Sequence, residues 1–376
     1  MIYHGDAYQY ILQTPDILLE IFRKKEDILK DSIELVKKHK IEEIFLSGSG
    51  SSYNATLAAA TFAKKKLGIR VTPVFPVELS EEITVFPQNS LVIGISQQGT
   101  STAVIQALDK VRETGIPTIS MTGEYDTEIV SHADANIYVE CGYEDAGSTT
   151  KGYTATVLTL YLFLLEVAKN SEGDLKLKEE EITVYEERIQ KVILNLPKLL
   201  PICEKWAEKE AKKLRTCTDL IILTESNQKS LLLEEVLKIS ETSRFPVRGY
   251  EACEFIHGMY NAVTEQTEFL YLFSQSGSDS KEMQHLYEYY KGKNKQYAVN
   301  TQKETDDGLY AEFLQDSDFS TLEYAIPFQM LFVKASRERG MDLNIPKDPQ
   351  FHHYMGSKIG QEEDRRKRLF EGETFV

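Results

Sequence analysis

The feature that most constrains the fold is an apolar run that ends in a polar loop and continues as a helix. Residues 91–95 are apolar or glycine, which is typical of a strand buried on both faces of a parallel sheet. After Thr100 the apolar residues fall at helical spacing, at Val104, Leu108 and Val111. The loop between them holds hydroxyls, amides and one glycine, so backbone N–H groups at the helix N-terminus can face an anion. An ordinary strand followed by a capped helix would give the same pattern.

Other strands alternate with helices around this segment. Strands are predicted at 41–46, 71–76, 118–121 and 135–139, and a helix at 53–67. This alternation predicts a parallel sheet covered by helices on both faces. Ligands bind such sheets at the carboxyl ends of the strands, where the Ser/Gly-rich loop after the first strand and the loop after Ile95 would both lie.

The second half of the chain repeats the first at a nearly constant offset. Leu46 corresponds to Leu223, 177 residues later, and Ser96 corresponds to Ser274, 178 residues later. Two motif pairs at almost one offset predict two tandem α/β domains of similar fold. The second copy has Thr224-Glu-Ser-Asn-Gln in place of the Gly/Ser-rich loop. Because this segment is acidic and lacks glycine, we expect the phosphate site in the first domain.

We therefore predict an α/β protein with two tandem doubly wound parallel sheets in three-layer αβα domains, flanked by helices. A helix is expected to start at Thr14-Pro15-Asp16, and the tail 361–376 is expected to form a solvated, partly frayed helix. The predicted parts are N-terminal helices at 1–40, a sugar-phosphate-binding domain at 41–170, a linker helix at 171–213, a second domain at 214–340, and a C-terminal loop and tail at 341–376.

Composition limits the partners. The net charge of −16 argues against nucleic acid or an anionic membrane, since both require basic surfaces. No apolar stretch reaches membrane-spanning length, and the N-terminus lacks a basic region followed by an apolar one. Four cysteines without paired spacing favour reduced thiols and a cytoplasmic location. No cofactor or metal site is expected, because His352 and His353 are adjacent and lack a carboxylate cluster.

The strongest candidates for chemistry lie in the second domain. Glu234, Lys238 and Glu241 fall on one face of a predicted helix at 231–241. Such triplets often form surface ion pairs, but the rest of this helix is apolar, so shifted pKa values are expected. His257 follows, although a lone histidine is more often structural. A carboxylate and a histidine could open a sugar ring and move a proton beside a carbonyl, and Lys238 could form a Schiff base with a ketose.

Taken in order, these segments resemble the isomerase half of glucosamine-6-phosphate synthase and, more broadly, the sugar-isomerase (SIS) domain proteins. The resemblance covers roughly residues 10–360, with a looser match at 344–358. The segments that carry it are 49–53, 95–101, 144–154, Glu234-x3-Lys238-x2-Glu241 and His257-Gly258.

The resemblance implies a role for each matching residue. Glu241 would shuttle a proton between C1 and C2, and His257, from the other subunit of a homodimer, would open the ring. Lys238 could form an imine with the ketose, and Lys358 would lie over the sugar. The residues that would hold the sugar phosphate are Ser49, Gly50, Ser51, Ser52, Ser96, Gln97, Gln98, Thr100 and Ser101, with Gly147 and Thr149 alongside.

Several departures from that family bear on the substrate. The chain has no N-terminal glutaminase domain and no cysteine near its start, so glutamine-driven synthesis is not expected of this chain alone. Gln98 replaces a serine, Ser240 a lysine and Met259 a proline. We predict an amino-sugar-phosphate isomerase or deaminase that acts on an aminated hexose 6-phosphate through ring opening and C1–C2 proton transfer. The alternatives are a fructosamine-6-phosphate deglycase, which releases an amino acid and glucose 6-phosphate, and a non-catalytic sugar-phosphate-binding module.

Overall fold

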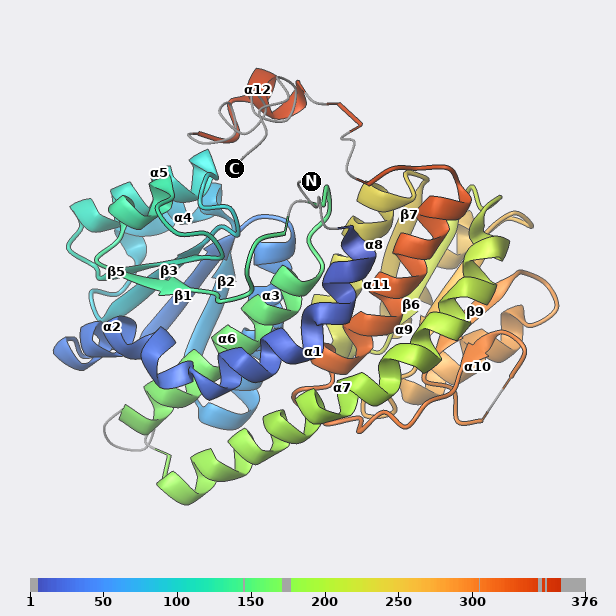
Figure 1. Cartoon of the computed structure of the whole chain (residues 1–376), viewed down its shortest axis with the longest axis horizontal. Helices are drawn as coiled ribbons and strands as arrows, with labels where there is room; N and C mark the ends of the chain where they lie inside the picture. The colour runs from blue at the N-terminus through green and yellow to red at the C-terminus, as the bar shows by residue number, and fades with distance from the viewer. Residues whose placement is uncertain are drawn as a thin grey trace, which may run out of the picture.

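The computed structural model describes residues 6–144, 146–170, 177–303, 305–343, 347–348 and 350–359. Within them the chain forms two α/β halves that lie side by side, with α7 running along both (Figure 1). The predicted tail helix at 361–376 lies outside the described residues, as do residues 171–176 of the predicted linker helix.

The first half is built on a five-stranded parallel sheet with the order β2-β1-β3-β4-β5. Its strands are β1 (Glu43–Gly48), β2 (Arg70–Val74), β3 (Ser90–Ile95), β4 (Thr118–Thr122) and β5 (Ala135–Tyr138). Its helices are α1 (Ala7–Arg23), α2 (Lys25–Lys38), α3 (Ser51–Phe62), α4 (Pro76–Glu82), α5 (Thr102–Glu113) and α6 (Lys151–Asn170).

The second half has the same strand arrangement, with the order β10-β9-β8-β6-β7. Here β6 takes the place of β1, and β8 takes the place of β3. The prediction of two tandem doubly wound domains is therefore confirmed. The strands are β6 (Leu220–Thr224), β7 (Val247–Glu251), β8 (Glu268–Leu272), β9 (Gln296–Val299) and β10 (Gly308–Leu309), and the helices are α7 (Glu179–Leu214), α8 (Lys229–Thr242), α9 (Ala252–Phe255), α10 (Ser280–Tyr290), α11 (Thr321–Glu338) and α12 (Phe351–Met355).

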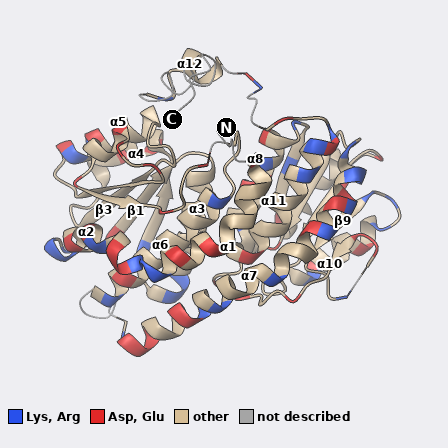
Figure 2. Cartoon of the chain, in the orientation of Figure 1, with Lys and Arg blue, Asp and Glu red and all other residues tan. Residues whose placement is uncertain are grey.

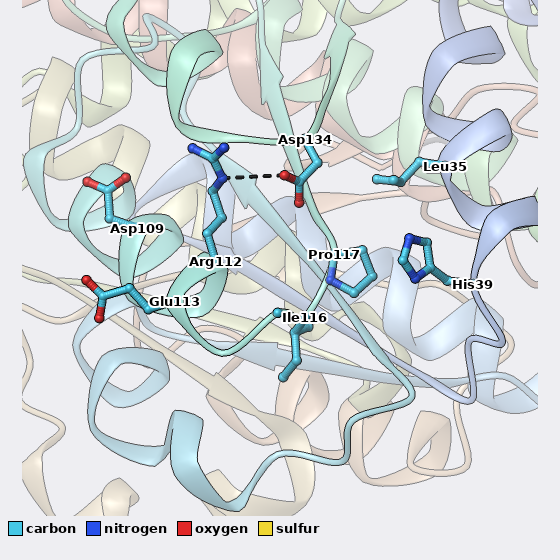
Figure 3. A pocket seen from close by; sticks show the side chains of 9 residues that line it. Leu35, His39, Asp109, Arg112, Glu113, Ile116, Pro117 and Asp134 are labelled. Atoms are coloured by element: carbon cyan, nitrogen blue, oxygen red, sulfur yellow. Dashed lines mark ion pairs between the residues drawn. The ribbon is translucent and has the colours of Figure 1, made fainter.

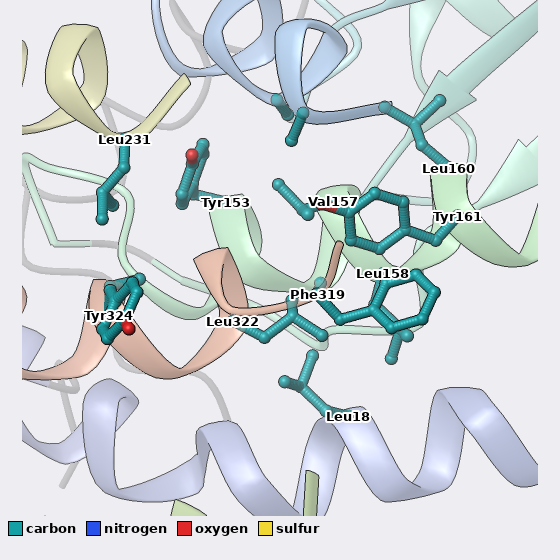
Figure 4. Close-up of a cluster of buried hydrophobic side chains, with 14 of the residues drawn as sticks. Leu18, Tyr153, Val157, Leu158, Leu160, Tyr161, Leu231, Phe319, Leu322 and Tyr324 are labelled. Atoms are coloured by element: carbon teal, nitrogen blue, oxygen red, sulfur yellow. The ribbon is translucent and has the colours of Figure 1, made fainter. Parts of the chain in front are cut away.

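Alternating side chains of β3 supply the cores on the two faces of the first sheet. Leu91 and Ile93 pack with α1, α3 and α6, whereas Val92 packs with α4 and α5. The larger of these two cores continues into the second half. Figure 4 shows Leu18, Tyr153, Phe319 and Tyr324 meeting there from both halves. Because this apolar core is shared, the two halves have a fixed mutual position, on which a site between them can depend.

The charged residues lie mainly on the outer helices. Figure 2 shows Lys, Arg, Asp and Glu interspersed on α2 and α7. A partly buried cluster of ion pairs joins α7 to the loop before α11. In it, Arg188 Nη2 lies 2.6 Å from both Asp316 Oδ1 and Asp318 Oδ2. No helix in the described part of the chain combines the length and the apolar character needed to cross a membrane.

The predicted helix start at Thr14-Pro15-Asp16 is wrong. Helix α1 begins at Ala7, and Pro15 lies inside it. Asp6 caps the helix, since its Oδ1 accepts a hydrogen bond from the Tyr8 N–H at 2.6 Å. An interior proline removes a backbone hydrogen bond, but Ile11 and Leu18 on either side of it are fully buried. The packing of this apolar face therefore stabilises the helix by more than the lost backbone hydrogen bond costs.

The contact between β3 and α5 generates a prediction. A Cβ on Gly94 would lie 2.7 Å from Leu108 Cδ1, and Leu108 is fully buried. We expect Gly94→Ala to lower the free energy of unfolding by about 1–3 kcal/mol, as overpacking does, measured by urea denaturation. The control is Leu108→Ala, alone and combined with Gly94→Ala. If the decreases in the free energy of unfolding of the two single variants simply add in the double variant, the side chains at positions 94 and 108 do not compete for the same space.

Candidate functional site

The candidate site lies at the carboxyl ends of the first sheet, where α8 of the second half packs against α3. Three loops reach this edge: one after β1, one after β3, and one that joins β5 to α6. The C-terminal segment carrying α12 returns from the second half over the first (Figure 1). Both halves therefore contribute to one site, as the binding rule for parallel sheets leads us to expect.

The loop after β3 is a compact turn that ends at the N-terminus of α5. The Gly99 N–H donates to the Ser96 carbonyl at 2.9 Å, and the Ser101 N–H donates to Ser96 Oγ at 3.3 Å. Gly99 has a φ of +66°, and a Cβ there would lie 2.0 Å from Thr127 Oγ1. Glycine is thus required both for the conformation and for the space. Thr100 is buried, and its carbonyl faces the C-terminal segment.

The side chain of Gln97 does not face this loop. Its Nε2 lies 3.0 Å from Cys141 Sγ, and its Oε1 accepts a hydrogen bond from Thr156 Oγ1 at 3.4 Å. What Gln97 offers a ligand is therefore its backbone N–H rather than its amide side chain. The sequence predicts Gln97 in the site but does not show which of these two groups contacts the ligand.

The loop after β1 connects the two halves. Ser51 Oγ and Asn54 Nδ2 donate to the two carboxylate oxygens of Glu234, each at 2.9 Å. Gly50 has a φ of +57° and leads directly into α3. Ser49 is exposed and Ser52 is half-buried. Ser51 is thus committed to Glu234, and the other two hydroxyls remain the candidates for ligand contact from this loop.

On α8 the three predicted charged residues lie together. Lys238 Nζ is 2.6 Å from Glu241 Oε2 and 3.6 Å from Glu234 Oε1. Ser148, in the loop before α6, also donates to Glu241 Oε2, at 2.9 Å. The Lys238 side chain is 3% exposed, whereas that of Glu241 is 34% exposed. A ligand in the first half can therefore reach the Glu241 carboxylate but not the buried ammonium.

The charges around Lys238 decide its protonation. Burial alone would lower the pKa of this ammonium, but the adjacent carboxylates of Glu241 and Glu234 outweigh that effect and raise the pKa above its ordinary value. Imine formation needs a neutral amine. The electrostatics thus favour Lys238 as a fixed counter-charge for the two carboxylates, and disfavour the imine role that the resemblance implied.

Glu235 is a notable residue that the sequence analysis did not single out. It is fully buried, and neither carboxylate oxygen has a hydrogen-bond partner among the described residues. Burial, together with the charge of Glu234, raises its pKa well above the ordinary value of 4.5. The available signal was its position between Leu231–Leu233 and Val236, because a charge within an apolar run is unusual.

The loop before α6 serves mainly to hold other segments. The Glu144 carboxylate accepts hydrogen bonds from the backbone N–H groups of Thr150, at 2.7 Å, and Gly152, at 3.0 Å, and so caps α6. The Gly147 N–H donates to the Leu343 carbonyl at 3.0 Å, and a Cβ on Gly147 would lie 2.4 Å from that oxygen. Gly147 thus anchors the C-terminal segment. Thr149 is half-buried beside it.

The C-terminal segment pairs with the loop after β3. Ser101 and Lys358 form an antiparallel bridge, and the Ile359 N–H donates to the Thr100 carbonyl at 2.9 Å. Lys358 Nζ donates to Gln98 Oε1 at 3.0 Å. The sequence match here was the loosest, yet the structure brings Lys358 to the predicted phosphate loop. Gln98, which departs from the family pattern, is its partner.

His257 is not bonded to this cluster within the described part of the chain. It is exposed and follows α9, and no hydrogen bond or ion pair joins its side chain to α8 among the described residues. Its exposed neighbours Ile256, Met259 and Tyr260 are apolar or aromatic. A histidine supplied by a second subunit would be presented from such a surface, and this expectation remains a prediction.

A depression lies elsewhere on the first half, away from the candidate site. Its volume is about 860 Å³, and it is lined by residues such as Arg112, Pro117 and Asp134 (Figure 3). Pro117 and Asp134 precede β4 and β5, so the depression opens at the amino ends of the strands, opposite the usual binding edge. Arg112 and Asp134 are paired with each other at 3.4 Å.

Among the described residues, no cluster of His, Cys, Asp and Glu is arranged to hold a metal ion, and all four cysteines are free thiols.

The environment of Glu235 predicts a pH-dependent stability. Because its folded pKa is raised, the unfolded chain loses this proton first as pH rises above 4.5. The free energy of unfolding of the wild type therefore falls by about 1.4 kcal/mol per pH unit relative to that of Glu235→Gln, until the pH reaches the pKa of Glu235 in the folded protein. We expect equal stabilities at pH 4 and a more stable variant at pH 7, measured by urea denaturation. Glu254→Gln, on the surface, is the control. A gain that persists unchanged at pH 4 would contradict the assignment.

Comparisons with known proteins agree with this architecture. The SIS domain family matches residues 37–166, which span the first sheet and most of α6. The glutamine–fructose-6-phosphate aminotransferase (isomerizing) of Clostridium tetani is 25% identical over 334 residues, which cover 86% of this chain and 54% of that protein. The chain thus spans about half the length of the aminotransferases that it matches.

Two solved structures extend the similarity over nearly the whole chain. A protein provisionally named a phosphosugar isomerase, from Clostridium difficile 630, has a TM-score of 0.87 and 28% identity, with coverage of 94% of this chain and 99% of that one. A protein provisionally named a sugar-binding protein, from Salmonella typhimurium LT2, has a TM-score of 0.78 and 31% identity, with coverage of 86% and 98%. The chain therefore belongs to the SIS-domain family and is homologous to the isomerase domain of glutamine–fructose-6-phosphate aminotransferase.

Proposed function

We propose that the protein is an enzyme that acts on an aminated hexose 6-phosphate, as an amino-sugar-phosphate isomerase or deaminase. The reaction proceeds through ring opening and proton transfer between C1 and C2. The observation that carries the proposal is the Glu241 carboxylate. It is 34% exposed, is held by Lys238 and Ser148, and faces the hydroxyl-bearing loops of the first half.

The geometry of Glu241 suits a general base. Lys238 and Ser148 both bind Oε2, and no hydrogen bond to Oε1 is present among the described residues. A base must have an acceptor atom within reach of the proton that it removes. With Oε2 fixed, Oε1 can receive a proton from the carbon next to the substrate carbonyl, and Glu241 then returns it to the neighbouring carbon.

The phosphate would lie at the loop after β3. The N-terminus of α5 and the hydroxyls of that loop provide hydrogen-bond donors for an anion. Lys358 lies beside them through its bond to Gln98, and adds a positive charge at the same edge. The similar aminotransferases are named for fructose 6-phosphate, which supports a hexose 6-phosphate here.

A second candidate is a sugar-phosphate-binding module without catalysis. Two observations favour it: the Salmonella typhimurium protein bears the name of a sugar-binding protein, and among the described residues the Glu241 carboxylate is bonded to Lys238 and Ser148 but to no histidine. A cytoplasmic homodimer with shared sites is part of the enzyme proposal. The exposed apolar residues beside His257 support this assembly.

Substitution of Glu241 separates these candidates. We expect Glu241→Gln to lower kcat by about 10²–10⁴-fold with little change in KM, because proton transfer is lost and the side-chain shape is kept. The assay offers glucosamine 6-phosphate and fructoselysine 6-phosphate separately, and detects fructose 6-phosphate with ammonia or glucose 6-phosphate with lysine.

Glu251→Gln, in the same half, is the control and should leave kcat unchanged. Glucose 6-phosphate from the second substrate would identify a deglycase instead of a deaminase. Binding of both substrates without turnover by the wild type would contradict the enzyme proposal and support the binding module.

The shared site makes a separate prediction. Glu241→Gln and His257→Ala chains, each inactive alone, should regain activity when unfolded together and refolded as a mixture. Half of the dimers would then be mixed, and each would contain one intact site, so about one quarter of wild-type activity is expected. A mixture of Glu241→Gln with itself is the control. No recovery, with mixed dimers demonstrated by differential tagging, would show that His257 does not act across subunits.

A further inference from the structure

The second half contains an anion site that its own chain fills. Glu225, which follows β6, is 1% exposed. Its Oε2 accepts hydrogen bonds from Ser274 Oγ at 2.6 Å, from the Gly277 N–H at 2.7 Å and from Ser280 Oγ at 2.8 Å. Its Oε1 accepts one from the Gln275 N–H at 3.0 Å. Four donors from one strand–loop–helix segment thus converge on a single carboxylate.

This donor set is what a phosphate-binding loop offers. Backbone N–H groups and hydroxyls at a helix N-terminus bind anions through charge-assisted hydrogen bonds. A Cβ on Gly277 would lie 2.7 Å from Glu225 Oε2, so the close approach of the carboxylate requires glycine there. The carboxylate of Glu225 therefore marks where an anion is held in this fold.

The same segment recurs in the first half without the built-in anion. At the offset of 178 residues, Ser274 corresponds to Ser96, Gln275 to Gln97, and Ser280 to Thr102. Ser280 and Thr102 are each the first residue of their helix, α10 and α5 respectively. At the offset of 177 residues that relates Leu46 to Leu223, the counterpart of Glu225 is Gly48, where a Cβ would lie 2.8 Å from Ser52 Cβ. A side chain at position 48 would collide with Ser52, and glycine supplies no carboxylate to the loop after β3.

Thr102 is the residue that this correspondence singles out. Its hydroxyl oxygen is buried and has no hydrogen-bond partner among the described residues. A buried hydroxyl without a partner is costly, and its counterpart on Ser280 is bonded to Glu225. The Thr102 N–H already donates to the Ser357 carbonyl at 3.2 Å, so the hydroxyl is the group left for a ligand.

One donor differs between the halves. The Gly99 N–H bonds to the Ser96 carbonyl, whereas its counterpart, the Gly277 N–H, bonds to Glu225. Three donors therefore carry over from the second half to the first: the hydroxyl of Ser96, the backbone N–H of Gln97 and the hydroxyl of Thr102.

We propose that the Thr102 hydroxyl binds the substrate phosphate together with Ser96 Oγ and the Gln97 N–H, in the arrangement by which the second half binds Glu225. Thr102 is not among the residues that the family resemblance implies. The inference rests on the proposed function, because it requires a phosphorylated substrate at this loop.

The experiment compares Thr102→Val and Thr102→Ser with the wild type by calorimetric titration of fructose 6-phosphate and of fructose. Valine keeps the shape and removes the hydroxyl, whereas serine keeps the hydroxyl. We expect Thr102→Val to weaken binding of fructose 6-phosphate at least tenfold and Thr102→Ser to bind it within about threefold of the wild type. Ser280→Ala is the matched control in the second half, and should lower the melting temperature without changing this affinity.

Thr102→Ala provides a second test if the valine variant does not fold. Wild-type-like affinity in a folded Thr102→Val or Thr102→Ala variant, with the wild type binding fructose 6-phosphate more tightly than fructose, would overturn this inference alone. If the wild type does not prefer the phosphorylated sugar, the proposed function fails, and the inference fails with it.

Discussion

The site depends on one buried carboxylate that joins the two halves. Glu234 belongs to the second half, yet its oxygens are bound by Ser51 and Asn54 of the first, each at 2.9 Å. Burial raises its pKa, while the nearby Lys238 ammonium and these two donors oppose that shift. Because the contact fixes α8 against α3, it sets where Glu241, two helical turns further on, meets the loops of the first sheet.

The two repeats have diverged into complementary roles. The first has Gly48 at the end of β1, where no carboxylate reaches the loop after β3. The second has Glu225 at the corresponding position, and this carboxylate accepts the hydrogen bonds of the loop after β8. A buried carboxylate with four donors rigidifies its surroundings, since removal of any one partner would leave a buried polar group unpaired. The second half can therefore form a rigid support that holds α8 against the first half.

Much of the fold could be predicted from the sequence, because it depends on patterns that are local or repeated. Alternating strands and helices, and the constant offset between Ser96 and Ser274, indicated the tandem sheets. The i, i+4 and i+7 spacing indicated the face shared by Lys238 and Glu241. What could not be predicted depends on packing between distant segments: the turned side chain of Gln97, the unpaired carboxylate of Glu235, and the first helix continuing through Pro15.

The two lysines near the site differ in what their surroundings allow. Lys238 is buried between carboxylates that raise its pKa, and its removal would leave Glu234 without a compensating charge in the shared core. Lys358 lies on a segment that pairs with the loop after β3 through backbone hydrogen bonds, and its ammonium is bonded to Gln98. Its positive charge therefore lies beside that loop, while Lys238 keeps the Glu241 carboxylate in place.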